Sequence, residues 1–111
     1  MLRRRATSSP LVDEPSLAEK AAEVLKAVGH PIRLRIIALL CEANANVGEL
    51  AERLAVPQAI ISQQLRILRM RGLAGVTRAE GHATYWLAEP HLRDLIGCVS
   101  GCVCSPKGRS R

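Results

Sequence analysis

Aromatic side chains are nearly absent from this chain, whose 111 residues include one Tyr, one Trp and no Phe. Any core must therefore be built from Leu, Ile, Val and Ala, and the abundance of Leu and Ala favours helices. No apolar run approaches the roughly 20 residues of a membrane-spanning helix. No apolar segment of signal-peptide length follows the charges at residues 3–5. We therefore expect a soluble, cytoplasmic protein with no membrane partner.

Acidic residues are also missing between Glu52 and Glu80, a stretch that contains Arg53, Arg66, Arg69, Arg71 and Arg78. The formal net charge is +6, and the two ends of the chain carry this excess through Arg3, Arg4, Arg5, Lys107, Arg109 and Arg111. A solvated helix face with basic tails would explain this pattern. Alternatively, arginines gathered on one surface would bind nucleic-acid phosphates, with the flexible ends adding affinity that does not depend on sequence.

The length of the chain suits one domain with one core. We expect a mobile basic arm over residues 1–15, a folded domain over residues 16–100 and a basic, cysteine-containing tail over residues 101–111. The arm is rich in Arg, Ser and Pro, which is typical of segments without a core.

Three helices are predicted in the first half of the chain. Ser16 and Glu19 have the spacing of a capping box, and the helix that follows them should end at Gly29. His30 is expected to cap a second helix, with proline at its first helical position. A third helix of about two turns is predicted over residues 47–54, and Pro57 follows its end.

A short break and a hairpin complete the predicted fold. Pro57 should separate the third helix from a fourth over residues 58–71. Residues 73–78 and 83–87 have the composition of paired strands, and Pro90 should open a fifth helix. We therefore expect a mainly α protein, a winged helix-turn-helix with five α-helices and one β-hairpin.

Three segments resemble the ArsR/SmtB family of winged-helix repressors. Residues 27–36, AVGHPIRLRI, are similar to the start of that family's second helix. Residues 61–73, ISQQLRILRMRGL, are similar to its recognition helix, and residues 78–86, RAEGHATYW, to its wing. The resemblance covers roughly residues 17–100. It implies a homodimer that binds an inverted repeat in double-stranded DNA and represses transcription until an inducer binds.

The helix-turn-helix, the wing and the cationic stretch together nominate side chains for DNA contact: Ser62, Gln63, Gln64, Arg66, Arg69, Arg78 and His82. The serine and the two glutamines are expected to approach base edges or the DNA backbone in the major groove. The two arginines of the recognition helix are expected at phosphate or guanine, and the last two residues should brace the wing. Gln64 stands where many members of the family carry His.

Cysteines near the carboxyl end are the candidate inducer site. In a chain without a secretory signal, clustered cysteines are more typical of metal or redox chemistry than of structural disulfides. Cys98 and Cys102 are four residues apart and should share a helix face. If the chain turns back after Gly101, Cys104 could join them. Three thiolates suit As(III) or Sb(III), which would act as inducer and would not be needed for folding.

Other readings of the cysteines and of the chain remain open. The alternative inducer is a persulfide or other reactive sulfur species, sensed by Cys41 with one carboxyl-terminal cysteine. The Ser-Gln-Gln-Leu segment resembles the branch of the family that responds to reactive sulfur, although Cys41 lies about one helical turn late for it. The cysteines could also be inert packing residues. An enzyme is not expected, because no catalytic motif accompanies the Cys and His residues. A dimerisation module without DNA binding would leave the arginines unexplained.

Overall fold

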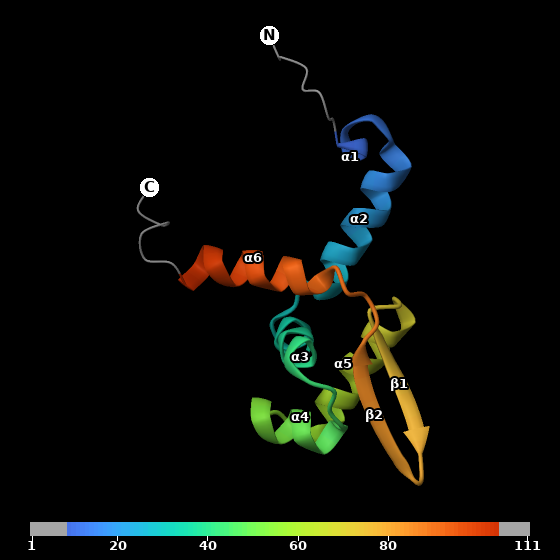
Figure 1. Ribbon diagram of the computed structural model, residues 1–111, viewed down its shortest axis with the longest axis vertical. Helices are drawn as coiled ribbons and strands as arrows, with labels where there is room; N and C mark the ends of the chain where they lie inside the picture. Colours follow the sequence, from blue (N-terminus) through green and yellow to red (C-terminus); the bar gives the residue numbers. More distant parts are fainter. Residues whose placement is uncertain (1–8, 105–111) are drawn as a thin grey trace.

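The computed structural model of the protein describes residues 9–104 (Figure 1). The elements in chain order are α1 (Pro10–Asp13), α2 (Pro15–Val28), α3 (Pro31–Glu42), α4 (Val47–Leu54), α5 (Gln58–Met70), β1 (Ala74–Ala79), β2 (His82–Leu87) and α6 (Leu92–Cys104). The predicted mainly helical winged helix-turn-helix is confirmed, with six helices in this part of the chain rather than five. In residues 9–104 no helix combines the length and apolarity needed to cross a membrane.

The additional helix, α1, lies inside the segment expected as an arm. Its amino-terminal end is capped by Ser9, whose Oγ accepts a hydrogen bond from the Leu11 N–H at 3.2 Å. None of its four residues is buried. A single turn with no buried face leaves no periodic pattern in the sequence, which is why the pattern did not indicate it.

The predicted capping box at the start of α2 is wrong. The helix begins at Pro15, so that Ser16 lies within its first turn and Glu14 is the N-cap, without a side-chain cap bond. Proline is suited to the first helical position because its φ is already helical and it has no N–H to satisfy. The expected cap of α3 is confirmed, since His30 Nδ1 accepts the Ile32 N–H at 3.1 Å.

A capping box does occur at α4, where the sequence analysis did not place one. Asn46 Oδ1 accepts the Glu49 N–H at 2.8 Å, and Glu49 Oε1 accepts the Asn46 N–H at 2.8 Å. The two bonds satisfy donors that a helix start otherwise leaves unpaired. They fix the first helix of the helix-turn-helix.

The core joins α3, α4 and α5. Its largest fully buried side chains are Ile36, Ile37, Leu40, Leu50, Ile61, Leu65 and Leu68. All are aliphatic, as the shortage of aromatics predicted. Truncating one such side chain to Ala typically costs about 2–5 kcal/mol, so this cluster fixes where α5 sits.

The hairpin of β1 and β2 is antiparallel, with Ala79 paired with His82 across a two-residue turn. Both turn residues are left-handed, Glu80 at φ 52° and Gly81 at φ 78°, which is the geometry that matches the twist of the strands. Tyr85 exchanges backbone hydrogen bonds of 2.8 and 3.1 Å with Ala45. This pairing anchors the hairpin to the segment between α3 and α4.

Helix α6 crosses α3 and runs to Cys104, through Gly97 and Gly101. Figure 1 shows α6 crossing the middle of the molecule above α3, while α2 extends away from the tip of the hairpin. Because α6 continues to Cys104, the chain does not turn back after Gly101 within the described residues, so Cys104 is not brought to Cys98 and Cys102 in that way. Each glycine costs a helix about 1 kcal/mol, but Leu92, Leu95 and Ile96 of α6 pack against the core and stabilise the helix.

Candidate nucleic-acid interface

A tight turn between α4 and α5 creates the helix-turn-helix. Ala55 closes α4 in the left-handed region at φ 58°, and Pro57 precedes the first turn of α5. The buried stripe of α5 consists of Ile61, Leu65 and Leu68. Because these three side chains are buried in the core, the opposite face of α5 is exposed to solvent.

The nominated DNA-contacting residues fall into two groups. Ser62, Gln63, Arg66, Arg69, Arg78 and His82 are exposed on α5 and the hairpin. Gln64 is half-buried and lies to the side of α5 that faces α3. The structure thus brings six of the seven nominated residues to the surface and separates Gln64 from its two neighbours.

The arginines of the cationic stretch differ in their partners. Arg53 forms an ion pair with Glu42 at 3.6 Å, and Arg71 with Glu23 at 2.6 Å. Within residues 9–104, Arg66, Arg69 and Arg78 enter none of the ion pairs. Their positive charges are available to an anion outside the chain.

A groove of about 660 Å³ separates the carboxyl-terminal half of α5 from the hairpin, lined by Arg66, Arg69, Met70, Ala74, Gly75, Val76 and Trp86. The Trp86 indole covers Gly75 so closely that a Cβ there would stand 2.4 Å from Trp86 Cζ2. Trp86 Nε1 donates to Thr77 Oγ1 at 2.9 Å, which fixes the ring. An apolar floor beside two guanidinium groups suits a sugar–phosphate backbone.

Five residues that line this groove were not nominated from the sequence, and two of them are large exposed side chains. Met70 is 76% exposed and Trp86 is 37% exposed. Trp86 is the only tryptophan of the chain and lies in the wing. A single large aromatic residue in a predicted wing is a feature that would have allowed its nomination.

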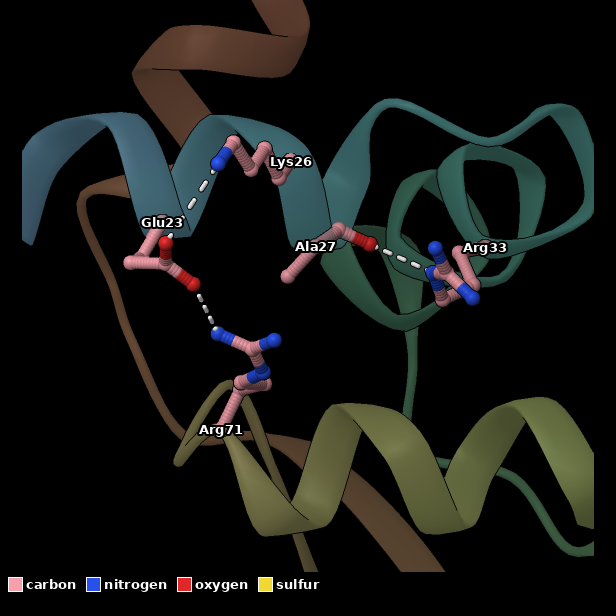
Figure 2. A network of polar contacts seen from close by, with 5 residues as sticks. All are labelled: Glu23, Lys26, Ala27, Arg33 and Arg71. Carbon is pink, nitrogen blue, oxygen red and sulfur yellow. Dashed lines mark hydrogen bonds and ion pairs between the residues drawn. The ribbon is translucent and has the colours of Figure 1, made fainter.

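Arg33 connects three helices. Its Nη1 donates to Gln64 Oε1 of α5 at 2.9 Å, and its Nε donates to the Ala27 carbonyl of α2 at 2.6 Å. Figure 2 shows the guanidinium of Arg33, from α3, directed at the end of α2. No local sequence pattern indicates this contact, because Arg33 and Gln64 are 31 positions apart.

A second polar contact joins α2 to the end of α5. Glu23 Oε1 accepts from Arg71 Nη1 at 2.6 Å, and Glu23 Oε2 lies 3.5 Å from Lys26 Nζ (Figure 2). The hydrogen bond from Arg71, with the charge of Lys26, lowers the pKa of Glu23. The carboxylate therefore stays ionised at neutral pH.

The carboxyl-terminal cysteines form a pair and an outlier. Cys98, Cys102 and Cys104 are all exposed on α6. At about 100° per residue, Cys98 and Cys102 are about 40° apart around the helix, whereas Cys104 is about 160° from Cys102. Within residues 9–104, no three His, Cys, Asp or Glu side chains gather closely enough to hold a metal ion. A single chain thus offers a dithiol on one face.

Cys41 lies half-buried on α3. Burial raises the pKa of its thiol, and the nearby Arg93 only partly opposes this effect. The residues of α6 that face α3 are Ile96, Val99 and Val103, and Cys98 is about 100–160° around the helix from each of them. Helical geometry therefore places Cys98 away from the side of α6 that lines a groove with α3.

An apolar groove of about 390 Å³ runs between α2 and α6, lined by Ala21, Val24, Leu25, Glu89, His91, Leu92 and Leu95. Leu25 is 55% exposed, and Val103 further along α6 is 69% exposed. Apolar surface of this kind on adjacent helices is typical of an interface.

Comparison with protein families gives a match to the family described as bacterial regulatory protein, arsR family, over residues 30–75. The matched segment runs from the cap of α3 to the start of β1. The chain is also 34% identical over 96 residues to the biofilm growth-associated repressor of Agrobacterium fabrum. This alignment covers 84% of the chain and 82% of that repressor.

Solved structures of regulators resemble the fold. The transcriptional repressor BigR from Xylella fastidiosa matches with a TM-score of 0.78 and 31% identity, over 84% of this chain and 95% of BigR. Reduced HlyU from Vibrio cholerae matches with a TM-score of 0.76 and 29% identity, over 84% and 98% of the two chains. A homodimeric winged helix-turn-helix DNA-binding domain from Mycobacterium bovis matches with a TM-score of 0.69 and 25% identity, over 86% and 87%.

Proposed function

Because the chain belongs to the ArsR family of bacterial regulatory proteins, we propose that it is a homodimeric repressor that binds an inverted-repeat operator. The proteins it matches are transcriptional regulators rather than enzymes, and the biofilm growth-associated repressor and BigR are named as repressors. The observation that carries the proposal is the outward face of α5, polar and cationic, beside the groove that leads to the wing.

The proposed DNA contacts follow from exposure and charge. Ser62 and Gln63 meet base edges in the major groove, and Arg66 and Arg69 meet phosphate or guanine. Arg78 and His82 hold the wing against the neighbouring sugar–phosphate backbone of the DNA. The three arginines of this set enter no ion pair among residues 9–104, which supports their role as phosphate ligands.

A second copy of the chain covers the apolar surface of α2 and α6. Leu25 is exposed and lines the α2–α6 groove, and Figure 1 shows α2 and α6 away from the tip of the hairpin, so a partner on these helices leaves both wings accessible. A homologous domain from Mycobacterium bovis is homodimeric. A two-fold dimer presents two recognition helices, which is why the operator is an inverted repeat.

The inducer in this proposal is a thiophilic species such as As(III) or Sb(III). Cys98 and Cys102 supply two thiolates on one face of α6, and soft thiolates are the donors that such ions prefer. The third thiolate is Cys104, from the partner copy or from a rearranged helix end. Because α6 borders the dimer surface, binding there can favour a dimer with poorly placed recognition helices.

A reactive sulfur species is the second candidate inducer. It is favoured by the similarity to HlyU, one of whose structures is of the reduced form. In that case a polysulfide oxidises two thiols of the chain to a disulfide or sulfur-bridged pair, and is itself reduced. The raised pKa of Cys41, and the position of Cys98 off the side of α6 that lines the groove with α3, oppose the pair that includes Cys41.

The test of DNA binding is a titration of the protein against its own promoter and a scrambled duplex. Arg66→Gln and Arg69→Gln should each weaken DNA binding. Each should also reduce the slope of log K against log salt concentration by about one, the contribution of one phosphate contact. Arg53→Gln is the matched control, because it removes the same charge from a residue already paired with Glu42. Equal affinity of the wild-type protein for both duplexes would overturn the proposal.

The inducer is tested by release of the promoter, with intact mass measured under non-reducing conditions. Release by As(III) that is lost in Cys98→Ser and Cys102→Ser supports the thiolate site. Release by polysulfide alone, with a mass change and loss of thiols, supports the redox alternative. If neither agent releases wild-type protein from DNA, both inducer assignments fail while the repressor assignment stands.

The basic ends named in the sequence analysis lie outside the described residues. We propose that residues 3–5 and the cations at 107, 109 and 111 add affinity that does not depend on sequence. Deleting both ends should flatten the salt slope equally on the promoter and the scrambled duplex. An unchanged slope would contradict this role.

A further inference from the structure

Gln64 differs in its surroundings from the two residues that precede it on α5. Ser62 and Gln63 are exposed, whereas Gln64 is half-buried and its Oε1 already accepts a hydrogen bond from Arg33. A glutamine reads adenine with its oxygen and its nitrogen together. The amide oxygen can accept a second hydrogen bond, but the bond from Arg33 directs the half-buried amide toward α3, away from the exposed face that carries Ser62 and Gln63.

The other bond of Arg33 reaches the end of α2. The Ala27 carbonyl belongs to the last turn of α2, where helix geometry leaves carbonyls without a partner in the helix. Arg33 is itself half-buried, so its two bonds are poorly replaced by water. One guanidinium thus ties the carboxyl end of α2 to the middle of α5.

The Glu23–Arg71 ion pair supplies a second tie between the same two helices. Glu23 and Ala27 are four residues apart and share a face of α2. Gln64 and Arg71 are seven residues apart, about two turns, and share the side of α5 that faces α2 and α3. Two ties at different points along both helices restrain the angle between them as well as their distance. Figure 2 shows the contacts of Arg33 and Arg71 with α2.

We propose that Arg33 and Gln64 are positioning residues, which set the orientation of the recognition helix relative to α2, and that Gln64 does not read a base. Arg71 and Glu23 assist as the second, more exposed tie. Because α2 carries part of the apolar surface given above to the partner copy, the ties also couple the dimer to α5. This inference rests on the proposed DNA binding.

The test uses the dimeric protein and a panel of operators in which each base pair is replaced in turn. Gln64→Met keeps the length of the side chain and removes its acceptor, and Arg33→Met removes the donor. Each variant should weaken operator binding about tenfold. The loss should be the same factor for every operator in the panel, because a misplaced helix weakens all base contacts together.

Non-additivity is the second expected result. The double variant should bind the operator about as well as either single variant. Once one change has broken the Arg33–Gln64 hydrogen bond, the second change has no α2–α5 tie left to remove. Gln63→Ala is the matched control on the same helix, and it should instead lose preference at particular base pairs. Circular dichroism and sedimentation confirm that each variant is folded and dimeric.

The opposite results overturn the inference. If Gln64→Met loses preference at one base pair, Gln64 reads that base. If the effects of Gln64→Met and Arg33→Met multiply, they act separately. Should Arg33→Met fail to fold, the operator panel with Gln64→Met alone still decides between the two roles. If the wild-type protein itself does not distinguish the operator from a scrambled duplex, the proposed function has failed rather than this inference.

Discussion

At the scale of single residues, burial divides the thiols of the chain by reactivity. Cys41 is half-buried with a raised pKa, while Cys104 is exposed at the end of α6. The thiolate is the reactive form, and so we expect iodoacetamide near pH 8 to modify Cys104 before Cys41. Peptide mass mapping over time measures the two rates. In urea, where the protein is unfolded, the two thiols should react at comparable rates. Comparable rates in the folded protein would contradict the half-buried position of Cys41.

A second prediction at this scale concerns the exposed pair at the start of α6. His91 Nδ1 lies 2.6 Å from Glu89 Oε2, and this contact raises the pKa of His91 above 6.5 and lowers the pKa of Glu89 below 4.5. The contribution of His91 to stability is full below pH 6.5 and is lost as the pH rises through its raised pKa. That of Glu89 is present above pH 4.5 and is lost as the pH falls through its lowered pKa. The ion pair is therefore formed between the lowered pKa of Glu89 and the raised pKa of His91.

An NMR titration of His91 checks the pair. Glu89→Gln should return the midpoint toward 6.5, because Glu89 is the main cause of the shift. Asp94→Asn is the control, since Asp94 contributes least. A larger change in the control than in Glu89→Gln would show that the contact is not formed in solution.

Residue patterns predicted some contacts and could not predict others. The cap at His30 was predictable, because a cap acts between neighbours in sequence. The bond from Arg33 to Gln64 was not, since it depends on how α3 packs against α5. The same holds for the groove under Trp86, which exists only once α5 and the hairpin are in place.

At the scale of elements, α4 depends on its capping box. Asn46→Ala removes the side chain that accepts the Glu49 N–H, and should destabilise the protein by about 1 kcal/mol. Urea unfolding at a fixed protein concentration measures this cost. Asn44→Ala, at an exposed residue just before the same helix, should change stability by less than about 0.5 kcal/mol. Equal costs for the two variants would argue against the box.

Boundaries of elements were predictable where a strong local signal exists. The hairpin and the fourth predicted helix agree with β1, β2 and α5 to within one residue, because Pro57, Gly72 and Gly81 mark their ends. The carboxyl end of α6 was not predictable from its glycines. Their local cost is opposed by packing of α6 on α3, which the sequence of the helix alone does not reveal.

At the scale of the whole molecule, the dimer depends on α2. Leu25→Glu places a carboxylate on the exposed apolar surface and should weaken dimerisation at least about tenfold, or 1.4 kcal/mol. Operator affinity should fall with it, since one recognition helix then binds alone. Sedimentation velocity measures the dimer. Ala43→Glu, which adds the same charge at an exposed residue outside α2 and α6, should leave the dimer unchanged.

The central claim is that two copies of this chain read an inverted repeat through α5 and the wing. Hydroxyl-radical footprinting of the protein on its own promoter tests it most directly. We predict two protected half-sites related by an inverted repeat, their centres about 34–36 Å apart or a multiple of this distance. Protection should disappear in Arg66→Gln with Arg69→Gln and persist in Arg53→Gln. A single protected site without symmetry, or uniform protection of the whole duplex, would contradict the account.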